Sequence, residues 1–120
     1  MNSKLNELTR MRKKSHMKFK EYNSKVYEKF IELEEAAYSE GVLTRQTKLL
    51  IGIGISVVKN CEACMQWHIE EAARYGVTPQ EIMDAIGIGI KMGGGPAVVS
   101  SRFAIEVMEE VFKNWTPKLE

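Results

Sequence analysis

The segment that decides the fold class begins Thr78-Pro-Gln-Glu81 and continues to Ile86-Gly-Ile-Gly-Ile90. The alternation of isoleucine and glycine is typical of a β-strand. The residues before it favour a helix, because Thr78 is a good N-cap, proline suits the first helical position and Glu81 at the third completes a capping box. At helical spacing Ile86 and Ile90 share one row, and the glycines allow a neighbouring helix to approach closely. We therefore expect a buried helix here.

An earlier copy of the alternation, Ile51-Gly-Ile-Gly-Ile55, follows a similar helix opening at Thr44-Arg-Gln46, so we expect a second buried helix. Upstream, apolar residues recur every three or four positions, which predicts one amphipathic helix ending near Gly41. These residues are Phe19, Tyr22, Val26, Phe30, Leu33 and Ala37.

Two more helices complete the prediction. One has Asn60 as its N-cap and Cys61 as its first residue, and it ends at Tyr75-Gly76. The last begins at Pro96, after the glycine run Gly93–Gly95 breaks the chain. Five helices and no strand define an all-α fold.

The length of 120 residues and the 44% hydrophobic content predict a single domain, residues 1–120, with its core at about 30–112. Residues 1–20 form a basic arm with seven basic residues against Glu7 alone, hence a charge of +6. We do not expect nucleic-acid binding, because no aromatic or glycine-rich recognition pattern accompanies these charges. The sequence shows neither a secretory signal nor an apolar run of membrane-spanning length, so we expect a cytoplasmic protein without a membrane partner.

Cys61, Cys64 and His68 are the candidate site residues. Cysteines two residues apart in a chain without an export signal are typical of a reactive or metal-binding pair. On a helix Cys64 and His68 share a face with β-carbons about 5–6 Å apart, so the imidazole can reach the thiol directly or through a water. Cys61 is close enough to Cys64 for a disulfide with local adjustment. A helix N-terminus and a nearby histidine lower a thiol pKa, which predicts a thiol redox site.

Two alternatives remain open for these residues. Two cysteines and a histidine could hold zinc, but a structural zinc site normally takes four protein ligands and only the remote His16 is left to complete it. The cysteines could also be inert and pack as small hydrophobic residues. We expect no metal and no organic cofactor.

Several segments together resemble the carboxymuconolactone decarboxylase and AhpD-like alkylhydroperoxidase family, from about Phe30 to Val111. They are Gly41-Val-Leu-Thr44, Cys61-Glu-Ala-Cys64-Met-Gln-Trp-His68, the capping box at Thr78 and Gly93-Gly-Gly-Pro-Ala97. The resemblance implies an all-helical fold that assembles as a homo-oligomer, a trimer or hexamer.

In the peroxidase branch, the resemblance implies a hydroperoxide substrate and a dithiol or thioredoxin- or lipoyl-type reductant. Cys64 would then be peroxidatic, Cys61 resolving and His68 the proton relay. One position departs from the family pattern: the relay glutamate twelve residues before the first cysteine is Leu49. Glu35, Glu71 or an acid from another subunit are the candidate replacements. The departure favours an alternative function, a non-catalytic redox-responsive or structural oligomer.

Overall fold

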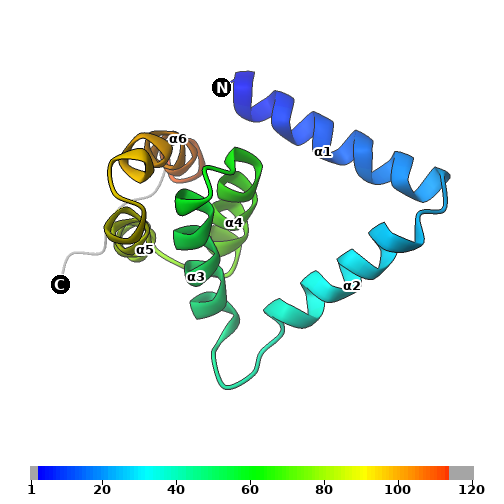
Figure 1. The fold of residues 1–120 in the computed structure, drawn as a ribbon, viewed down its shortest axis with the longest axis horizontal. Helices are drawn as coiled ribbons and strands as arrows, with labels where there is room; N and C mark the ends of the chain where they lie inside the picture. Colours follow the sequence, from blue (N-terminus) through cyan, green and yellow to red (C-terminus); the bar gives the residue numbers. More distant parts are fainter. Residues whose placement is uncertain (1–2, 114–120) are drawn as a thin grey trace. The chain divides into compact units, whose positions relative to one another are not determined.

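The computed structural model describes residues 3–113, which form helices and no strand, so the all-α prediction is confirmed (Figure 1). The six helices are α1 (Ser3–Glu21), α2 (Lys25–Tyr38), α3 (Arg45–Val58), α4 (Glu62–Arg74), α5 (Pro79–Gly93) and α6 (Gly95–Val111). The chain divides into two compact units, residues 1–45 and residues 46–120. The expectation of a single domain stays a prediction.

The first unit holds α1 and α2, and here the prediction of one helix through the stripe from Phe19 to Ala37 is wrong. Asn23 adopts a left-handed φ of 54° and ends α1, with the Ser24 amide bonding back to the Phe19 carbonyl at 3.1 Å. The Ser24 hydroxyl then accepts from the amide of Tyr27 at 3.1 Å and caps α2. Asparagine tolerates this backbone region and serine is a good N-cap, so the pair divides the stripe between two helices.

The second unit holds α3 to α6, and α6 contacts both α4 and α5. Both isoleucine–glycine segments are helical, as their openings predict. Ile53 and Ile86 of these segments are buried in the core, whose other largest buried side chains are Leu49, Val57, Met65, Ile69, Ile82 and Val107. Among the described residues, no helix combines the length and the apolar content that crossing a membrane requires.

The predicted helix signals of α5 and α6 are present. Thr78 Oγ1 accepts from the Glu81 amide at 3.2 Å, and the Glu81 carboxylate accepts from the Thr78 amide at 2.9 Å. Gly94, with a φ of 69°, separates α5 from α6, and Pro96 lies in the first turn of α6. The capping box is therefore formed as the sequence predicts, and the segment after it is a helix and not a strand.

At Gly89 the backbone of α5 lies close to α3. A β-carbon there would lie 2.7 Å from the Gly54 carbonyl oxygen and 3.2 Å from the β-carbon of Val57. The nearer of these atoms is backbone and cannot rotate away, so the approach requires glycine. This is the close helix contact that the glycine spacing predicts.

We expect Gly89→Ala to lower the free energy of unfolding by about 1–3 kcal/mol, because overpacking forces α3 and α5 apart. Gly87→Ala is the matched control on the same helix, since its β-carbon would meet nothing within 4 Å. The control should be neutral or stabilise by up to about 1 kcal/mol through helix propensity. Urea unfolding of both variants measures the difference, and equal midpoints would contradict the close approach.

Candidate functional site

The turn that joins α3 to α4 places the cysteine pair. Asn60 has a left-handed φ of 52°, and its amide bonds to the Val57 carbonyl at 3.2 Å while the Cys61 amide bonds to the Ser56 carbonyl at 3.1 Å. These two bonds form the Schellman motif that ends many helices. The prediction that Asn60 caps α4 is therefore wrong: Asn60 ends α3, in a conformation that asparagine tolerates better than most residues.

Cys61 itself is the N-cap of α4, so the cap and the helix start each lie one residue later than predicted. Its backbone is extended, with φ −100° and ψ 98°, and α4 begins at Glu62. Its sulfur accepts a hydrogen bond from the amide of Cys64 at 3.2 Å. A sulfur at this place lies at the positive end of the helix dipole, which favours the thiolate over the thiol once the pair is reduced.

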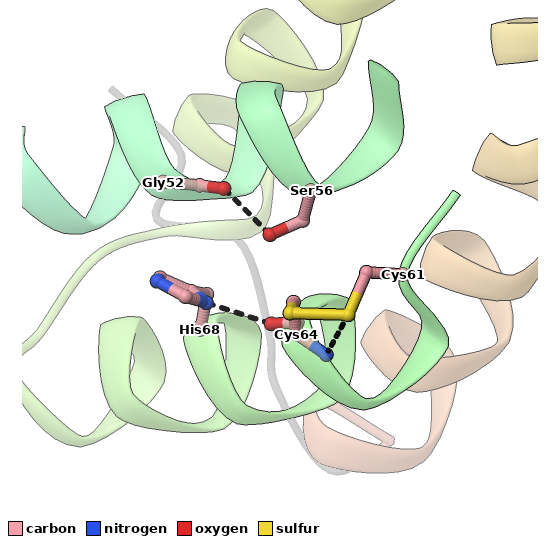
Figure 2. Close-up of a disulfide and its surroundings, with 5 residues drawn as sticks. All are labelled: Gly52, Ser56, Cys61, Cys64 and His68. Atoms are coloured by element: carbon pink, nitrogen blue, oxygen red, sulfur yellow. Dashed lines mark hydrogen bonds between the residues drawn. A yellow bond between two sulfur atoms is a disulfide. The ribbon is translucent and has the colours of Figure 1, made fainter. Parts of the chain in front are cut away.

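Cys61 and Cys64 are joined by a disulfide, with their α-carbons 5.2 Å apart, so the prediction that the pair can close is confirmed. Both residues are half-buried. Figure 2 shows the sulfur of Cys64 on the side of the bond toward His68. A disulfide-bonded pair therefore lies at the start of α4 and remains partly open to solvent.

His68 lies one turn after Cys64, and its ring contacts the backbone. Nδ1 is 2.7 Å from the Cys64 carbonyl oxygen. A carbonyl only accepts, so Nδ1 carries the proton and Nε2 holds the lone pair of the neutral ring. Figure 2 shows that second nitrogen on the side of the ring away from the disulfide. In this arrangement, a proton passing between Cys64 and Nε2 needs a bridging water or a rotation of the ring.

Burial lowers the pKa of His68 below its ordinary value, and this outweighs the opposing effects of the Cys64 carbonyl and the negative charge of Glu71. The ring is therefore held neutral near pH 7. A neutral imidazole can take a proton from a thiol, as the relay expected from the sequence requires.

Ser56 belongs to the same site and was missed by the sequence reasoning. It is 3% exposed, and its hydroxyl donates to the Gly52 carbonyl at 2.6 Å. Figure 2 shows the hydroxyl on the side of α3 that faces the disulfide. The available signal was a single hydroxyl residue inside the apolar stretch from Leu49 to Val58.

The acids weighed as replacements for the relay glutamate differ in position. Leu49 is 1% exposed in the core, so α3 presents no carboxylate there. Glu71 lies three residues after His68 on α4, with its side chain 18% exposed and paired to Arg74 at 3.2 Å. Glu35 lies on α2, in the other unit. Glu71 is therefore the acid that the second unit itself brings near His68.

The zinc alternative receives no geometric support from the described residues. No cluster of three histidine, cysteine or acidic side chains among them is arranged to hold a metal ion, and the two cysteine sulfurs are bonded to each other. His16, the remote fourth ligand considered above, lies 2.6 Å from the Tyr27 hydroxyl in the first unit. The expectation of no metal stays a prediction.

Comparisons with known proteins agree on one family. The model of the carboxymuconolactone decarboxylase family matches residues 24–107. A Paracoccus denitrificans protein known as uncharacterized protein 4 in the cox locus is 32% identical over 82 residues, which are 68% of this chain and 74% of the relative.

Solved structures lead to the same family. A carboxymuconolactone decarboxylase family protein from Legionella pneumophila superposes with a TM-score of 0.86 at 28% identity, over 92% of this chain and 98% of the other. A Thermotoga maritima member, for which a part in the antioxidative response has been suggested, gives a TM-score of 0.81 at 26% identity, over 89% and 91% of the two chains.

The lowered pKa of His68 predicts how stability changes with pH. The folded state binds the proton more weakly than the unfolded state, whose histidine titrates near pH 6.5, at about its reference value. Stability from this group is therefore fully present above about pH 6.5 and is lost as the pH falls toward the lower pKa of the folded protein. Melting temperatures at pH 5 and pH 7.5 should differ less in His68→Gln than in the parent, and equal differences would contradict the shift.

Proposed function

This chain belongs to the carboxymuconolactone decarboxylase family, and from that membership we propose that it is a thiol peroxidase that reduces hydroperoxides with electrons from an external dithiol. The observation that carries the proposal is the Cys61–Cys64 disulfide at the N-cap of α4, one turn from a histidine with a lowered pKa. The part in the antioxidative response suggested for the Thermotoga maritima relative agrees with this chemistry.

In the proposed cycle, the Cys64 thiolate attacks the peroxide and breaks the O–O bond. Cys64 becomes a sulfenic acid, and the leaving alkoxide takes up a proton to give an alcohol. The Cys61 thiolate then attacks the sulfenic sulfur, which forms the disulfide and breaks the S–O bond, and the hydroxide that leaves takes up a proton to become water. A dithiol returns two electrons and two protons to the pair and leaves as its own disulfide.

The division of roles between the cysteines follows their places on α4. Cys64 is the thiol on the His68 side, which supports its assignment as the peroxidatic residue with His68 as proton relay (Figure 2). The sulfur of Cys61 accepts the Cys64 amide at the helix terminus. That bond favours a thiolate, the form that a resolving cysteine needs in order to attack a sulfenic acid.

The proposed reductant and cellular compartment follow from this chemistry. The reductant is a dithiol of the thioredoxin or lipoyl type, and a reducing compartment such as the cytoplasm is where such thiols remain reduced.

We also propose a homo-oligomer, a trimer or hexamer. Eighteen large hydrophobic side chains are exposed along the described part of the chain, many for a chain of this size to leave uncovered.

A second function is favoured by Leu49. With this buried apolar side chain at the position of the family's relay glutamate, the pair could respond to oxidation without sustained turnover. Peroxide consumption in the presence of excess dithiothreitol separates the two functions. An enzyme should consume many equivalents of peroxide per chain at a rate far above that of dithiothreitol alone, whereas a chain without sustained turnover should add little to the rate of dithiothreitol alone.

The assignment of roles predicts different products for two cysteine variants. In Cys64→Ser the reaction with peroxide should be lost, because the attacking thiolate is gone. In Cys61→Ser one oxidation should proceed and leave Cys64 as a trapped sulfenic acid, because no resolving thiol is present. Single-turnover peroxide consumption with mass spectrometry of the cysteines measures both. Sulfenic acid on Cys61 in Cys64→Ser, with an inert Cys61→Ser, would reverse the roles.

A further prediction concerns His68 and the nearby carboxylate. His68→Ala should slow the attack on peroxide by roughly 10²-fold or more if the ring acts as general base.

Because the Glu71 charge raises the pKa of His68, Glu71→Gln should shift the rise of rate with pH toward lower pH. Glu70→Gln is the control, since Glu70 accepts from Gln66 at 3.2 Å. Identical pH–rate profiles for Glu71→Gln and the parent would exclude Glu71 from the relay.

A further inference from the structure

The two sulfurs of the disulfide differ in their contact with the start of α4. The Cys64 amide donates to the sulfur of Cys61 at 3.2 Å, so this capping bond supports the proposed resolving cysteine. The ring of His68 bonds through Nδ1 to the Cys64 carbonyl, and its other nitrogen lies on the side away from the disulfide (Figure 2). A cysteine attacks as its thiolate. A donor from a neighbouring helix would stabilise that form of Cys64.

Ser56 on α3 carries a donor at the right place. Its side chain is 3% exposed, and its hydroxyl donates to the Gly52 carbonyl at 2.6 Å. Figure 2 shows the hydroxyl directed from α3 toward the disulfide, on the side of the Cys64 sulfur. The Ser56 carbonyl accepts from the Cys61 amide at 3.1 Å. A backbone hydrogen bond therefore holds Ser56 in place beside the cysteine pair.

The bond from Ser56 to Gly52 is not one that α3 requires. A carbonyl inside an α-helix has its regular partner in the amide four residues later, which for Gly52 is the amide of Ser56. Serine is a poorer helix residue than alanine, and a hydroxyl that bonds four residues back slightly destabilises a helix. The hydroxyl can therefore leave the Gly52 carbonyl without breaking the helix.

We propose that the Ser56 hydroxyl donates to the Cys64 sulfur when the pair is reduced, and to the Gly52 carbonyl when the pair is oxidised. A disulfide sulfur is a weak acceptor, whereas a thiolate forms a strong charge-assisted hydrogen bond. Rotation about the Cα–Cβ bond of Ser56 exchanges one acceptor for the other. The inference rests on the proposed function in one respect, the assignment of Cys64 as the attacking thiol. Ser56 then contacts the reacting atom and keeps it ionised.

The charged groups of the elements around Cys64 act on it more weakly. They are Glu62, His68, Glu70, Glu71 and Arg74 on α4, Arg45 and Lys48 on α3, Lys59 in the turn, and Arg102, Glu106, Glu109 and Glu110 on α6. The glutamates of α4 disfavour a thiolate, because like charges raise a thiol pKa, and burial keeps the ring of His68 neutral near pH 7.

The cationic side chains among them are exposed or distant. Lys59, Arg74 and Arg102 are exposed, so solvent screens their charges. The basic residues of α3 lie at least eight residues before Ser56, which is about 12 Å along the helix axis. A neutral hydroxyl directed at the sulfur is therefore the stronger local support for a thiolate on Cys64.

The first experiment measures the ionisation of Cys64 in the full chain carrying Cys61→Ser, in which Cys64 is the sole cysteine. The ultraviolet absorbance of the thiolate, followed against pH, gives the pKa of Cys64. Adding Ser56→Ala should raise this pKa, so that the ratio of thiolate to thiol at a given pH falls by about tenfold, as expected for a lost hydrogen bond to a charged group. Ser56→Thr keeps a hydroxyl and should keep the pKa close to that of the Cys61→Ser chain.

Ser101→Ala is the matched control. Ser101 is 7% exposed, and its hydroxyl donates to a carbonyl of its own helix, that of Val98, at 2.7 Å. Loss of this buried hydroxyl should leave the pKa of Cys64 unchanged. The proposal is overturned by an unchanged pKa in Ser56→Ala, which would leave Ser56 with its bond to Gly52 alone. A shift of equal size in Ser101→Ala would also overturn it.

A second measurement uses the chain with both cysteines. Because the hydroxyl stabilises the reduced pair, Ser56→Ala should make reduction by dithiothreitol less favourable. At a pH where Cys64 is ionised, the equilibrium constant should fall by about tenfold. An equilibrium equal to that of the parent would contradict the exchange of acceptors.

Peroxide consumption distinguishes this inference from the proposed function. A parent chain without peroxide turnover, together with a raised Cys64 pKa in Ser56→Ala, would overturn the enzyme and retain the hydrogen bond. Turnover by the parent with an unchanged pKa in Ser56→Ala would retain the enzyme and overturn the hydrogen bond.

Discussion

The chain leaves α3 through Asn60, whose φ of 52° lies in a backbone region that few residues other than glycine adopt. That conformation turns the Cys61 amide back to the Ser56 carbonyl and leaves the sulfur of Cys61 to cap α4. This start of α4 fixes where Cys64 and His68 lie relative to Cys61. The disulfide between the two cysteines depends on it. Ser100 on α6 holds the turn from the other side, donating to Asn60 Oδ1 at 3.0 Å. The local backbone conformation thus positions the proposed chemistry.

The sequence predicts the fold class because its decisive signals are local. The capping box at Thr78 and Glu81 closes within one turn, so it identifies a helix start even before a strand-like run of isoleucine and glycine. The errors at Asn23 and Asn60 have one cause. Asparagine is favoured both before a helix and just after one, and the hydrophobic spacing does not distinguish these places. The backbone bonds that decide between them become visible only in the structure.

Helix spacing alone predicts one part of the candidate site. The separation of Cys61, Cys64 and His68 is enough to place them along one face of α4, and the structure has them there. The direction of the His68 ring and the presence of Ser56 depend on how α3 packs against α4, which no short-range pattern encodes. The lowered pKa of His68 has the same origin, since burial is its largest cause.

The hydrogen-bond acceptor of the His68 ring influences whether the ring accepts or donates a proton more readily. A backbone carbonyl holds the ring in one tautomer, but it stabilises an imidazolium less than a carboxylate does. With Leu49 buried in α3, the acidic charge that acts on His68 within the described part of the second unit is that of Glu71, which is shared with Arg74. The ring is therefore better suited to accept a proton from a thiol than to keep one for a leaving alkoxide. Thiolate formation is therefore the easier half of the proposed cycle, and the proton for the leaving alkoxide comes from water at this half-buried site.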